Sequence, residues 1–425
     1  MRRRAPKAIL IMVLTPALLA LGAVASVLFL RQGGMAPFQL PGARSLPVVT
    51  PQLAERGRYL ARLGNCVGCH TTNGGPRLAG GRAFHTEYGT VYSTNLTPDR
   101  QHGIGDWSRE EFRHAMRHGV SRHGVSSPVF PYSSFRHLSD EDLDALRAFL
   151  STVPPSARPR TPNALEFPAN LPGAMMMWRL LFLRPPAPPV SSDATAARGE
   201  YLVRGIGHCA TCHASRGAFA SFELDRALWG ARVAGWHAPA LHGLGLKRFA
   251  EGELARYLQG GAPRAVGAYG LMADVVSRNL QYLSDEDALA IEVYLRTLQP
   301  PPPEDAPQLR LRAGEQSLRV GRTVYEEHCA ACHGDEGQGE PDKYPSLRDS
   351  PAIVGKDPVN LIKLVLFGAV APSTSINPLP YTMPPSSHVL TADEVAGVVN
   401  YLRVQADTDA MPVSPDNVRA LGGIH

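Results

Sequence analysis

The stretch Cys66-Val67-Gly68-Cys69-His70 decides the fold of this chain, because its pattern Cys-x-x-Cys-His occurs three times. The other copies are Cys209-Ala210-Thr211-Cys212-His213 and Cys329-Ala330-Ala331-Cys332-His333. Together they use all six cysteines, so none remains for a disulfide or a nucleophile. The pattern is the attachment signal for haem c, in which the cysteines form thioethers with the porphyrin and the histidine is the proximal iron ligand. The sequence therefore predicts three covalently bound haem c groups.

Two other uses of paired cysteines fit less well. A structural zinc site needs four ligands, and each motif offers two cysteines without a second cysteine pair or a spaced histidine pair. A thioredoxin-like redox pair lies where a strand meets a helix, and no such strand is predicted here. Three copies of the motif with no spare cysteine favour haem over both.

The N-terminal residues 1–31 are predicted to form a membrane anchor. A basic cluster at residues 2–7 precedes an uninterrupted apolar run at residues 8–30, which Arg31 closes. About 20 apolar residues cross a bilayer, whereas the core of a cleaved signal is about 7–15 residues long. Residues 23–25 offer a cleavage site, so removal stays open. The basic cluster predicts a bacterial inner-membrane anchor with the haem domains in the periplasm.

The net charge of +5 comes from this N-terminal region. No acidic residue occurs among residues 1–31, so the exported part is close to neutral and a nucleic-acid partner is not expected. The basic residues that supply the excess are Arg2, Arg3, Arg4, Lys7 and Arg31.

Each haem motif belongs to an internal repeat that ends with a capped amphipathic helix. Ser139, Ser284 and Thr391 start these helices, and each is followed three residues later by an acidic residue that completes the cap signal. Finding the same signal in three corresponding places indicates a repeat. In the second of these helices, Leu289 and Tyr294 are expected to point inward.

A glycine precedes each haem motif, and an aromatic residue lies in each closing helix. Glycine lets two helices approach closely, so we expect the first and last helices of each repeat to cross at these residues. The expected pairs are Gly57 with Phe149, Gly199 with Tyr294, and Gly321 with Tyr401.

Proline-rich composition marks the boundaries between the repeats. Within the first linker, residues 175–183 are apolar but too few to span a bilayer, so packing on the neighbouring domains and contact with a membrane or quinone both remain open. The expected division is an anchor at 1–31, domains at 50–153, 193–299 and 313–406, linkers at 154–192 and 300–312, and a tail at 407–425 with no clear pattern.

An electron-transfer haem commonly has a second axial ligand, which is methionine or histidine. Such a methionine usually lies in the loop before the last helix. The third repeat has Met383 in that place, and the second has Met272 slightly further from its helix. The predicted iron ligands are therefore His213 with Met272 and His333 with Met383.

The first repeat departs from this pattern, because its loop at residues 126–132 has no methionine. Met116 aligns with Leu258 and Val365, which read as core positions, so packing is favoured over ligation. His118 and His123 lie nearer the loop and can coordinate iron. The iron held by His70 can also be five-coordinate, and the sequence leaves these alternatives open.

The pattern as a whole resembles the three-haem cytochrome c subunit of membrane-bound bacterial dehydrogenases. The similarity covers residues 55–403, and its specific segments include residues 91–99, 103–108 and 235–239. It implies an all-α fold of three tandem cytochrome c domains behind an N-terminal transmembrane helix. The family often has methionine where this chain has Phe130, which puts the potential of the first haem in question.

The resemblance also implies a function. A separate catalytic dehydrogenase subunit, carrying flavin, pyrroloquinoline quinone or a molybdenum cofactor, would pass electrons through the haems to ubiquinone or a downstream cytochrome or oxidase. No nucleotide loop, Ser-His-Asp set or paired catalytic carboxylates are recognisable, so independent substrate turnover is not expected. The alternatives are a peroxidase-like haem enzyme with an open iron at His70 and a free-standing cytochrome that feeds an oxidase.

Overall fold

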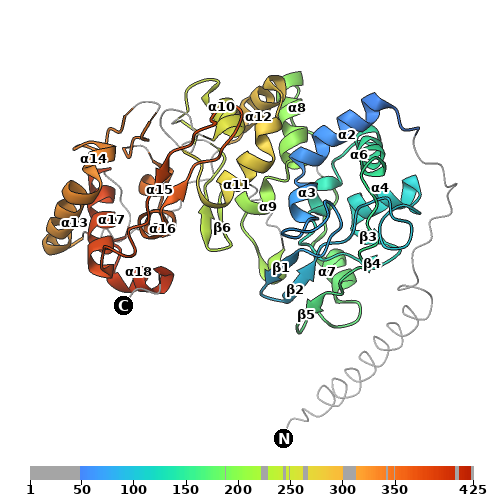
Figure 1. Cartoon of the computed structure of the whole chain (residues 1–425), viewed down its shortest axis with the longest axis horizontal. Helices are drawn as coiled ribbons and strands as arrows, with labels where there is room; N and C mark the ends of the chain where they lie inside the picture. The colour runs from blue at the N-terminus through green and yellow to red at the C-terminus, as the bar shows by residue number, and fades with distance from the viewer. Residues whose placement is uncertain are drawn as a thin grey trace, which may run out of the picture.

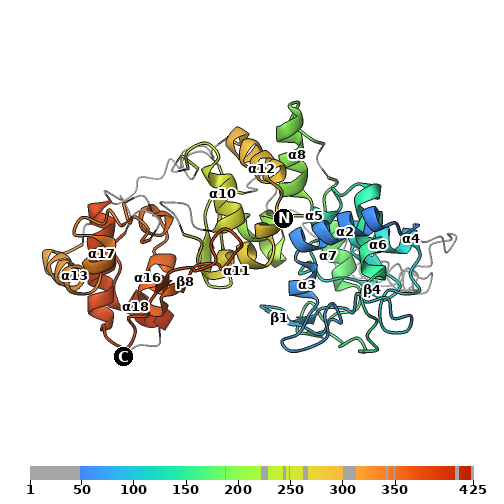
Figure 2. The same cartoon turned by 45° about the horizontal axis from the view of Figure 1, so that its top comes forward.

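The computed structural model describes residues 48–422, apart from residues 187, 222–227, 243–245, 248, 262–266, 300–312, 341–342, 349 and 407–410. Three helical repeats follow one another along the long axis of the molecule, from the blue end of the chain to the red end (Figure 1). The second repeat lies between the first and the third (Figure 2).

The predicted membrane span at residues 8–30 lies outside the described residues. Within the described part of the chain, no helix combines the length and the apolar character needed to cross a membrane.

Each repeat is built on a first and a last helix that cross at a glycine. A Cβ atom on Gly57, Gly199 or Gly321 would lie within 2.0 Å of a carbonyl oxygen of the last helix and within 2.8 Å of the Cβ of its aromatic residue. The predicted crossings at Phe149, Tyr294 and Tyr401 are therefore confirmed. The pairs are α2 (Pro51–Leu63) with α6 (Asp140–Ser151), α8 (Ala194–Arg204) with α12 (Asp285–Thr297), and α13 (Glu315–His328) with α17 (Ala392–Gln405).

The predicted caps of the three last helices are also confirmed. The hydroxyls of Ser139, Ser284 and Thr391 each accept a hydrogen bond from the backbone N–H three residues later, at 3.2, 3.1 and 3.3 Å. One inward position was wrong: Leu289 on α12 is 43% exposed, whereas Ile291 is buried. The buried stripe of α12 is rotated because Glu292, rather than an apolar residue, turns inward and binds the backbone of α10 (Glu253–Gly260).

The remaining helices of the described chain are short and surround the crossing pairs. In repeats 1 and 2 they are α3 (Cys66–Cys69), α4 (Arg109–His118), α5 (Tyr132–Phe135), α9 (Ala210–His213), α10, α11 (Gly270–Arg278), η1 (Ala218–Ala220) and η4 (Leu280–Tyr282). In repeat 3 they are α14 (Ala330–His333), α15 (Pro351–Val354), α16 (Val359–Phe367) and α18 (Pro415–Gly422).

The expectation of an all-α fold holds only for the helical framework, because the loops contain small antiparallel sheets. Strands of two to four residues pair the backbone of each long loop with itself, which satisfies its polar groups without a periodic sequence signal. These strands are β1 (Ala83–Thr86), β2 (Gly89–Tyr92), β3 (Val120–Ser121), β4 (Gly124–Val125), β5 (Ala164–Leu165), β6 (Ala231–Val233), β7 (Trp236–Ala238), β8 (Ala369–Val370) and β9 (Thr382–Met383).

Two segments without a clear sequence pattern are ordered by contacts. In the first linker, β5 pairs with β2, and α7 (Ala174–Phe182) buries Trp178. In the tail, α18 packs on α16 and α17. The side chain of Asn400 holds the backbone of Val413 through two hydrogen bonds, at 2.9 and 2.8 Å, and so ties the tail to α17.

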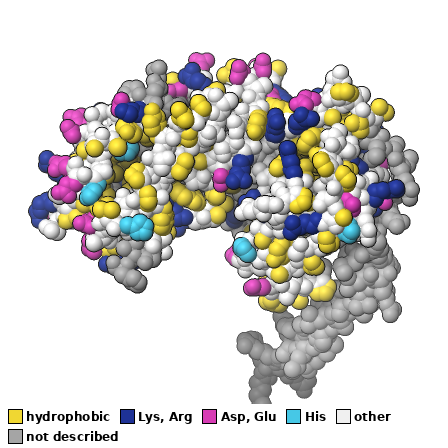
Figure 3. Space-filling model, viewed as in Figure 1, with side chains coloured by type: hydrophobic (Ala, Val, Ile, Leu, Met, Phe, Trp, Pro, Cys, Tyr) yellow, Lys and Arg dark blue, Asp and Glu magenta, His cyan; other side chains and the backbone are white. Residues whose placement is uncertain are grey.

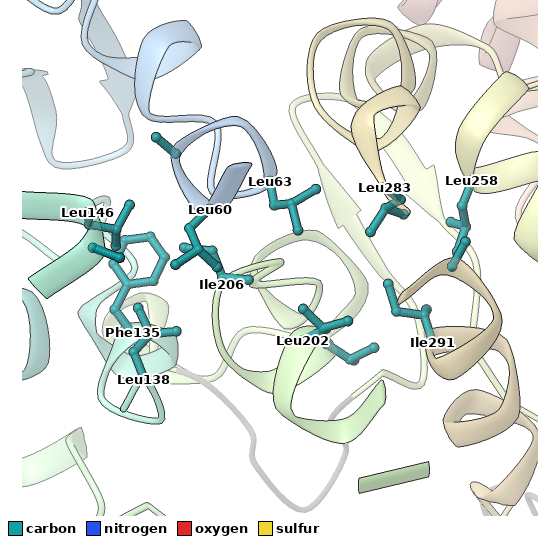
Figure 4. Close-up of a cluster of buried hydrophobic side chains, with 14 of the residues drawn as sticks. Leu60, Leu63, Phe135, Leu138, Leu146, Leu202, Ile206, Leu258, Leu283 and Ile291 are labelled. Atoms are coloured by element: carbon teal, nitrogen blue, oxygen red, sulfur yellow. The ribbon is translucent and has the colours of Figure 1, made fainter. Parts of the chain in front are cut away.

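Repeats 1 and 2 share one hydrophobic core. Leu60 and Leu63 of α2 lie beside Ile206 and Leu202, which belong to the first helix of repeat 2 and the turn that follows it (Figure 4). Repeat 3 has a separate core built on α16 and α17. The first two repeats therefore form one packed unit, whereas the third joins it through a smaller contact.

Reciprocal hydrogen bonds reinforce the joint between repeats 1 and 2. The hydroxyl of Tyr59 donates to Asp287 at 2.6 Å, and that of Tyr201 donates to Asp142 at 2.6 Å. Burial raises the pKa of Tyr201 to about 12, so the phenol remains a donor at neutral pH. Burial opposes ionisation of Asp287, yet the hydrogen bonds from Arg198 and Tyr59 hold its pKa below the usual value.

Replacing Tyr59 by phenylalanine is expected to lower the free energy of unfolding by about 2 kcal/mol, because a partly buried carboxylate loses a donor. Tyr201→Phe should cost a similar amount, since its contact is the mirror of the first. Chemical denaturation with a tryptophan fluorescence readout measures both. Tyr282→Phe, at a ring that is 40% exposed, is the control and should change stability by less than about 0.5 kcal/mol. Equal effects in Tyr59→Phe and the control would contradict a role for the hydroxyl.

Repeats 2 and 3 meet through polar contacts. Arg232 donates to both carboxylate oxygens of Asp357 at 2.5 and 2.8 Å. The side chain of Asn360 receives a hydrogen bond from the backbone N–H of His237 at 2.9 Å and donates to its carbonyl oxygen at 2.7 Å. The bidentate ion pair and the paired amide fix the orientation of α16 against β7.

Candidate haem-binding sites

The three Cys-x-x-Cys-His motifs lie just after the first helix of each repeat, where α3, α9 and α14 form single helical turns. Such a turn brings two cysteines three residues apart onto one side. No disulfide joins any of the six cysteines. Burial raises the pKa of Cys66 and Cys209 to about 12 and that of Cys329 to about 11.

Each motif histidine is held through its Nδ1 atom by a backbone carbonyl oxygen. Nδ1 lies 2.7 Å from the oxygen of Thr94 in His70, 2.7 Å from that of Pro239 in His213, and 3.0 Å from that of Pro345 in His333. A carbonyl only accepts, so Nδ1 carries the proton and Nε2 keeps its lone pair. This is the arrangement of a histidine that binds metal through Nε2.

Burial lowers the pKa of all three histidines, although the hydrogen bond to the carbonyl opposes the shift. The imidazoles are therefore neutral at neutral pH, as a metal ligand must be. The three sites share this chemistry although their loops differ.

In repeat 2 the structure brings both predicted iron ligands together. His213 and Met272 line one cavity, and Cys209 and Cys212 lie in its wall. The remaining lining is mainly apolar and comes from α8, α10, α11, α12, the segment around β6 and β7, and residues of both neighbouring repeats. An apolar slot with thiols at one wall and imidazole and thioether donors on its lining fits a porphyrin with six-coordinate iron. Met272 lies in helix α11 rather than in an extended loop.

In repeat 3 the structure places Met383 in β9, opposite Ala369 of β8. The strand follows α16, whose C-terminal Gly368 packs against the carbonyl oxygen of Met383. Met383 is half-buried. Its assignment as the partner of His333 stays a prediction from its place before α17.

In repeat 1 the candidate sixth ligands contact different neighbouring residues. Met116 on α4 and Phe130 both pack against the shared core, and the Phe130 ring lies 5.5 Å from that of Phe135. His118 stacks on His114 at 4.6 Å. His123 lies near Trp107, with ring centroids 6.0 Å apart. Met272, a predicted iron ligand, packs against the same core, so the contacts of Met116 do not separate packing from ligation and the sixth ligand of this iron stays open.

The sequence did not identify the carbonyl groups that orient the histidines. They follow their histidines by 24, 26 and 12 residues, so no constant spacing marks them. Two of the three belong to prolines, which is the one sequence signal available. The sequence analysis also missed Arg82 and Arg216, whose guanidinium groups donate hydrogen bonds to the attachment turns of repeats 1 and 2.

Two of the three irons are expected to have methionine as a ligand. Ferric-state spectroscopy should then show two methionine–iron signals per chain, and Met272→Ala and Met383→Ala should each remove about half of the total. The loss of the thioether should also lower the reduction potential of that haem. Met116→Ala serves as the control and should leave both signals intact. A third methionine signal that disappears in Met116→Ala would contradict the packing interpretation.

Comparisons with known proteins agree with this geometry. The family model of cytochrome c matches residues 54–154 and 319–405. The cytochrome c subunit of alcohol dehydrogenase (quinone) from Gluconacetobacter polyoxogenes is 36% identical over 392 residues, with 87% of this chain and 82% of that protein covered. The gluconate 2-dehydrogenase cytochrome c subunit of Pantoea cypripedii is 38% identical, with 83% and 85% covered.

A third relative is the fructose dehydrogenase cytochrome subunit of Gluconobacter japonicus, which is 32% identical and covers 86% of this chain and 82% of that protein. Similarity at this level extends across the repeats rather than over one motif. The expected resemblance is thus confirmed, and the family implies haem c bound covalently by the cysteine motifs. The chain belongs to the family of cytochrome c subunits of dehydrogenases.

Proposed function

We propose that this chain holds three haem c groups in three tandem cytochrome c domains and passes electrons from a catalytic dehydrogenase subunit to the respiratory chain. The observation that carries the proposal is the repeated site: three attachment turns, each with a histidine whose Nδ1 is bound to a backbone carbonyl. Each haem, when bound, supplies an iron that cycles between ferric and ferrous states. The protein positions these groups and adjusts their potentials.

The placement of the second site supports a relay. Leu63 and Asn65 of repeat 1 lie in the wall of the repeat 2 cavity, and so do Pro351 and Asn360 of repeat 3. Both neighbouring repeats would thus contribute residues to the cavity around a group bound by His213. This arrangement supports electron exchange between the middle haem and the other two.

The relatives support a catalytic dehydrogenase subunit as the partner. Their names refer to alcohol, gluconate and fructose dehydrogenases. Flavin, pyrroloquinoline quinone and molybdenum types are the proposed candidates for the partner of this chain. Apolar side chains lie exposed among charged ones on the face shown in Figure 3. Around β8 and β9, Val370 is 62% exposed and Leu379 is 86% exposed. This edge of repeat 3 offers a docking surface close to Met383.

The proposed location is the bacterial inner membrane, with residues 8–30 as the anchor and the haem domains in the periplasm. Helix α7 supports contact with a lipid phase, because Leu180 and Leu181 are 70% and 64% exposed while Trp178 of the same helix is buried. A cavity of about 1220 Å³ runs from this helix to Cys212 and is lined mainly by apolar groups. Ubiquinone, which is apolar, is the proposed acceptor, with a downstream cytochrome or oxidase as the alternative.

A peroxidase-like activity at the first haem is the second candidate. The observation that favours it is Phe130, which packs in the core at the position where the family often has a methionine ligand. Carbon monoxide, cyanide and hydrogen peroxide test it. Rapid binding of these ligands at one haem together with peroxide turnover would favour an enzyme, and slow binding at all three would favour the relay.

Purification in mild detergent tests the relay and its partner. We expect a large catalytic subunit to copurify and its substrate to reduce all three haems, followed by reoxidation on addition of a ubiquinone analogue. A chain that purifies alone and is reduced only by other cytochromes would instead indicate a free-standing cytochrome.

A further inference from the structure

Arg82 and Arg216 make the same contact in two different repeats. Arg82 donates from Nη1 to the carbonyl oxygen of Gly68 at 2.5 Å, and Arg216 donates from Nη2 to that of Thr211 at 3.1 Å. Gly68 and Thr211 are equivalent, since each directly precedes the second cysteine of its motif. The two guanidinium groups therefore bind the same carbonyl of the attachment turn.

The two arginines reach this place from different positions in the sequence. The repeats align through Gly80 and Gly230, whose N–H groups donate to the carbonyl oxygens of His70 and His213 at 2.7 and 2.8 Å. By that alignment, the counterpart of Arg82 in repeat 2 is Arg232. Arg232 instead forms the bidentate ion pair with Asp357 in repeat 3. Arg216, which lies four residues after Cys212, instead places a positive charge on the attachment turn of repeat 2.

Among the described residues of repeat 3, no arginine donates a hydrogen bond to the attachment turn. Its aligned glycine is Gly339, which donates to the carbonyl oxygen of His333 at 2.8 Å, and the residue two positions later in the sequence is the uncharged Pro341. The nearby Arg348 is paired with Glu336 at 2.6 Å, so its charge is largely compensated. In the part of the chain that the structure describes, an arginine thus binds the attachment turn in repeats 1 and 2.

The positive charge of each arginine is held beside the second cysteine of its motif, because the carbonyl that it binds belongs to the residue directly before that cysteine. The sulfurs concerned are those of Cys69 and Cys212. These sulfurs would be the thioether atoms of a bound haem. A fixed cation beside the haem destabilises the ferric group more than the ferrous group, because the ferric group carries one more positive charge.

We propose that Arg82 and Arg216 are positioning residues that raise the reduction potentials of the first and second haems relative to the same haems without a cation on the attachment turn. This inference rests on the proposed attachment of haem at Cys66–Cys69 and Cys209–Cys212. Arg82 is half-buried, and the exposed Arg216 is nevertheless desolvated enough to lower its pKa, so both charges are expected to act.

Spectroelectrochemical titration of the full-length protein in detergent tests the proposal, after the haem content per polypeptide has been measured. We expect Arg82→Gln to shift one of the three redox components to lower potential, and Arg216→Gln to shift a different component in the same direction. Arg82→Lys, which keeps the charge, should retain most of the original potential. Arg100→Gln is the control, because this exposed arginine pairs with Asp106 on the surface and should shift nothing.

A full haem content with unchanged potentials in both glutamine variants would overturn the proposal while leaving haem attachment intact. So would a fall in Arg82→Lys as large as that in Arg82→Gln, because this would show that the hydrogen bond matters and the charge does not. If Arg82→Gln loses its haem, the lysine variant decides: an unchanged potential supports the charge effect, and a lowered one contradicts it. A wild-type protein without haem would instead overturn the proposed function.

Discussion

Replacing Cys209 and Cys212 together by alanine is expected to lower the haem content per chain by about one third, and to interrupt electron transfer between the remaining two haems. Without thioethers the porphyrin of repeat 2 is no longer held covalently. The effect on electron transfer should exceed that of losing either other motif, because residues from both neighbouring repeats line the cavity of repeat 2. Mass spectrometry and the pyridine haemochrome assay measure the content.

The matched control is the double alanine variant of Cys329 and Cys332, at the C-terminal repeat. It should also lose about one third of the haem, yet it should leave repeats 1 and 2 packed, because repeat 3 has its own core. Native-state hydrogen exchange of α2 and α8 separates the two variants. An unchanged haem content after loss of Cys209 and Cys212 would refute covalent attachment at this motif.

The second large effect is expected at a helix crossing. Gly321→Ala should lower the free energy of unfolding of repeat 3 by about 3 kcal/mol, since its Cβ atom would lie 2.0 Å from the carbonyl oxygen of Gly397 and 2.8 Å from the Cβ of Tyr401. Both contacts involve rigid atoms of α17, so the helices must separate. The site of His333 lies directly after α13 and should lose order with it.

Gly314→Ala is a control on the same helix. Gly314 is the N-cap of α13, and a Cβ atom there would meet nothing within 4 Å, so we expect a cost below about 1 kcal/mol. Thermal unfolding followed by circular dichroism compares the two variants. If Gly321→Ala were as stable as Gly314→Ala, the close approach of α13 and α17 would not be needed for stability.

Much of the framework could be predicted because it depends on local signals. The cap residues at Ser139, Ser284 and Thr391 act on backbone groups three positions away, so their effect is visible in a short sequence window. The crossing glycines could be recognised for a similar reason, since a glycine recurred before every motif. The error at Leu289 shows the limit, because the buried Glu292 binds the backbone at the start of the distant helix α10 in addition to Arg296 of its own helix.

The site was predictable in part. The cysteines and histidines form a contiguous motif, whereas their supporting groups come from far along the chain. The carbonyl of Thr94 reaches the first motif only after the chain has turned back through β1 and β2, and the guanidinium of Arg82 reaches it from the residue just before β1. The joint between Tyr59 and Asp287 spans 228 residues. Such contacts leave no periodic mark in a single sequence.

The sequence alone determined the haem chemistry, the repeats and their crossing helices, because thioether attachment, helix capping and close packing each require particular residue types at short spacing. Only the tertiary structure decided that repeats 1 and 2 share a core, that the cavity at His213 and Met272 borders both neighbours, and that Arg82 and Arg216 converge on equivalent carbonyls. These features depend on which distant surfaces exclude water together, and that choice is made by the folded chain as a whole.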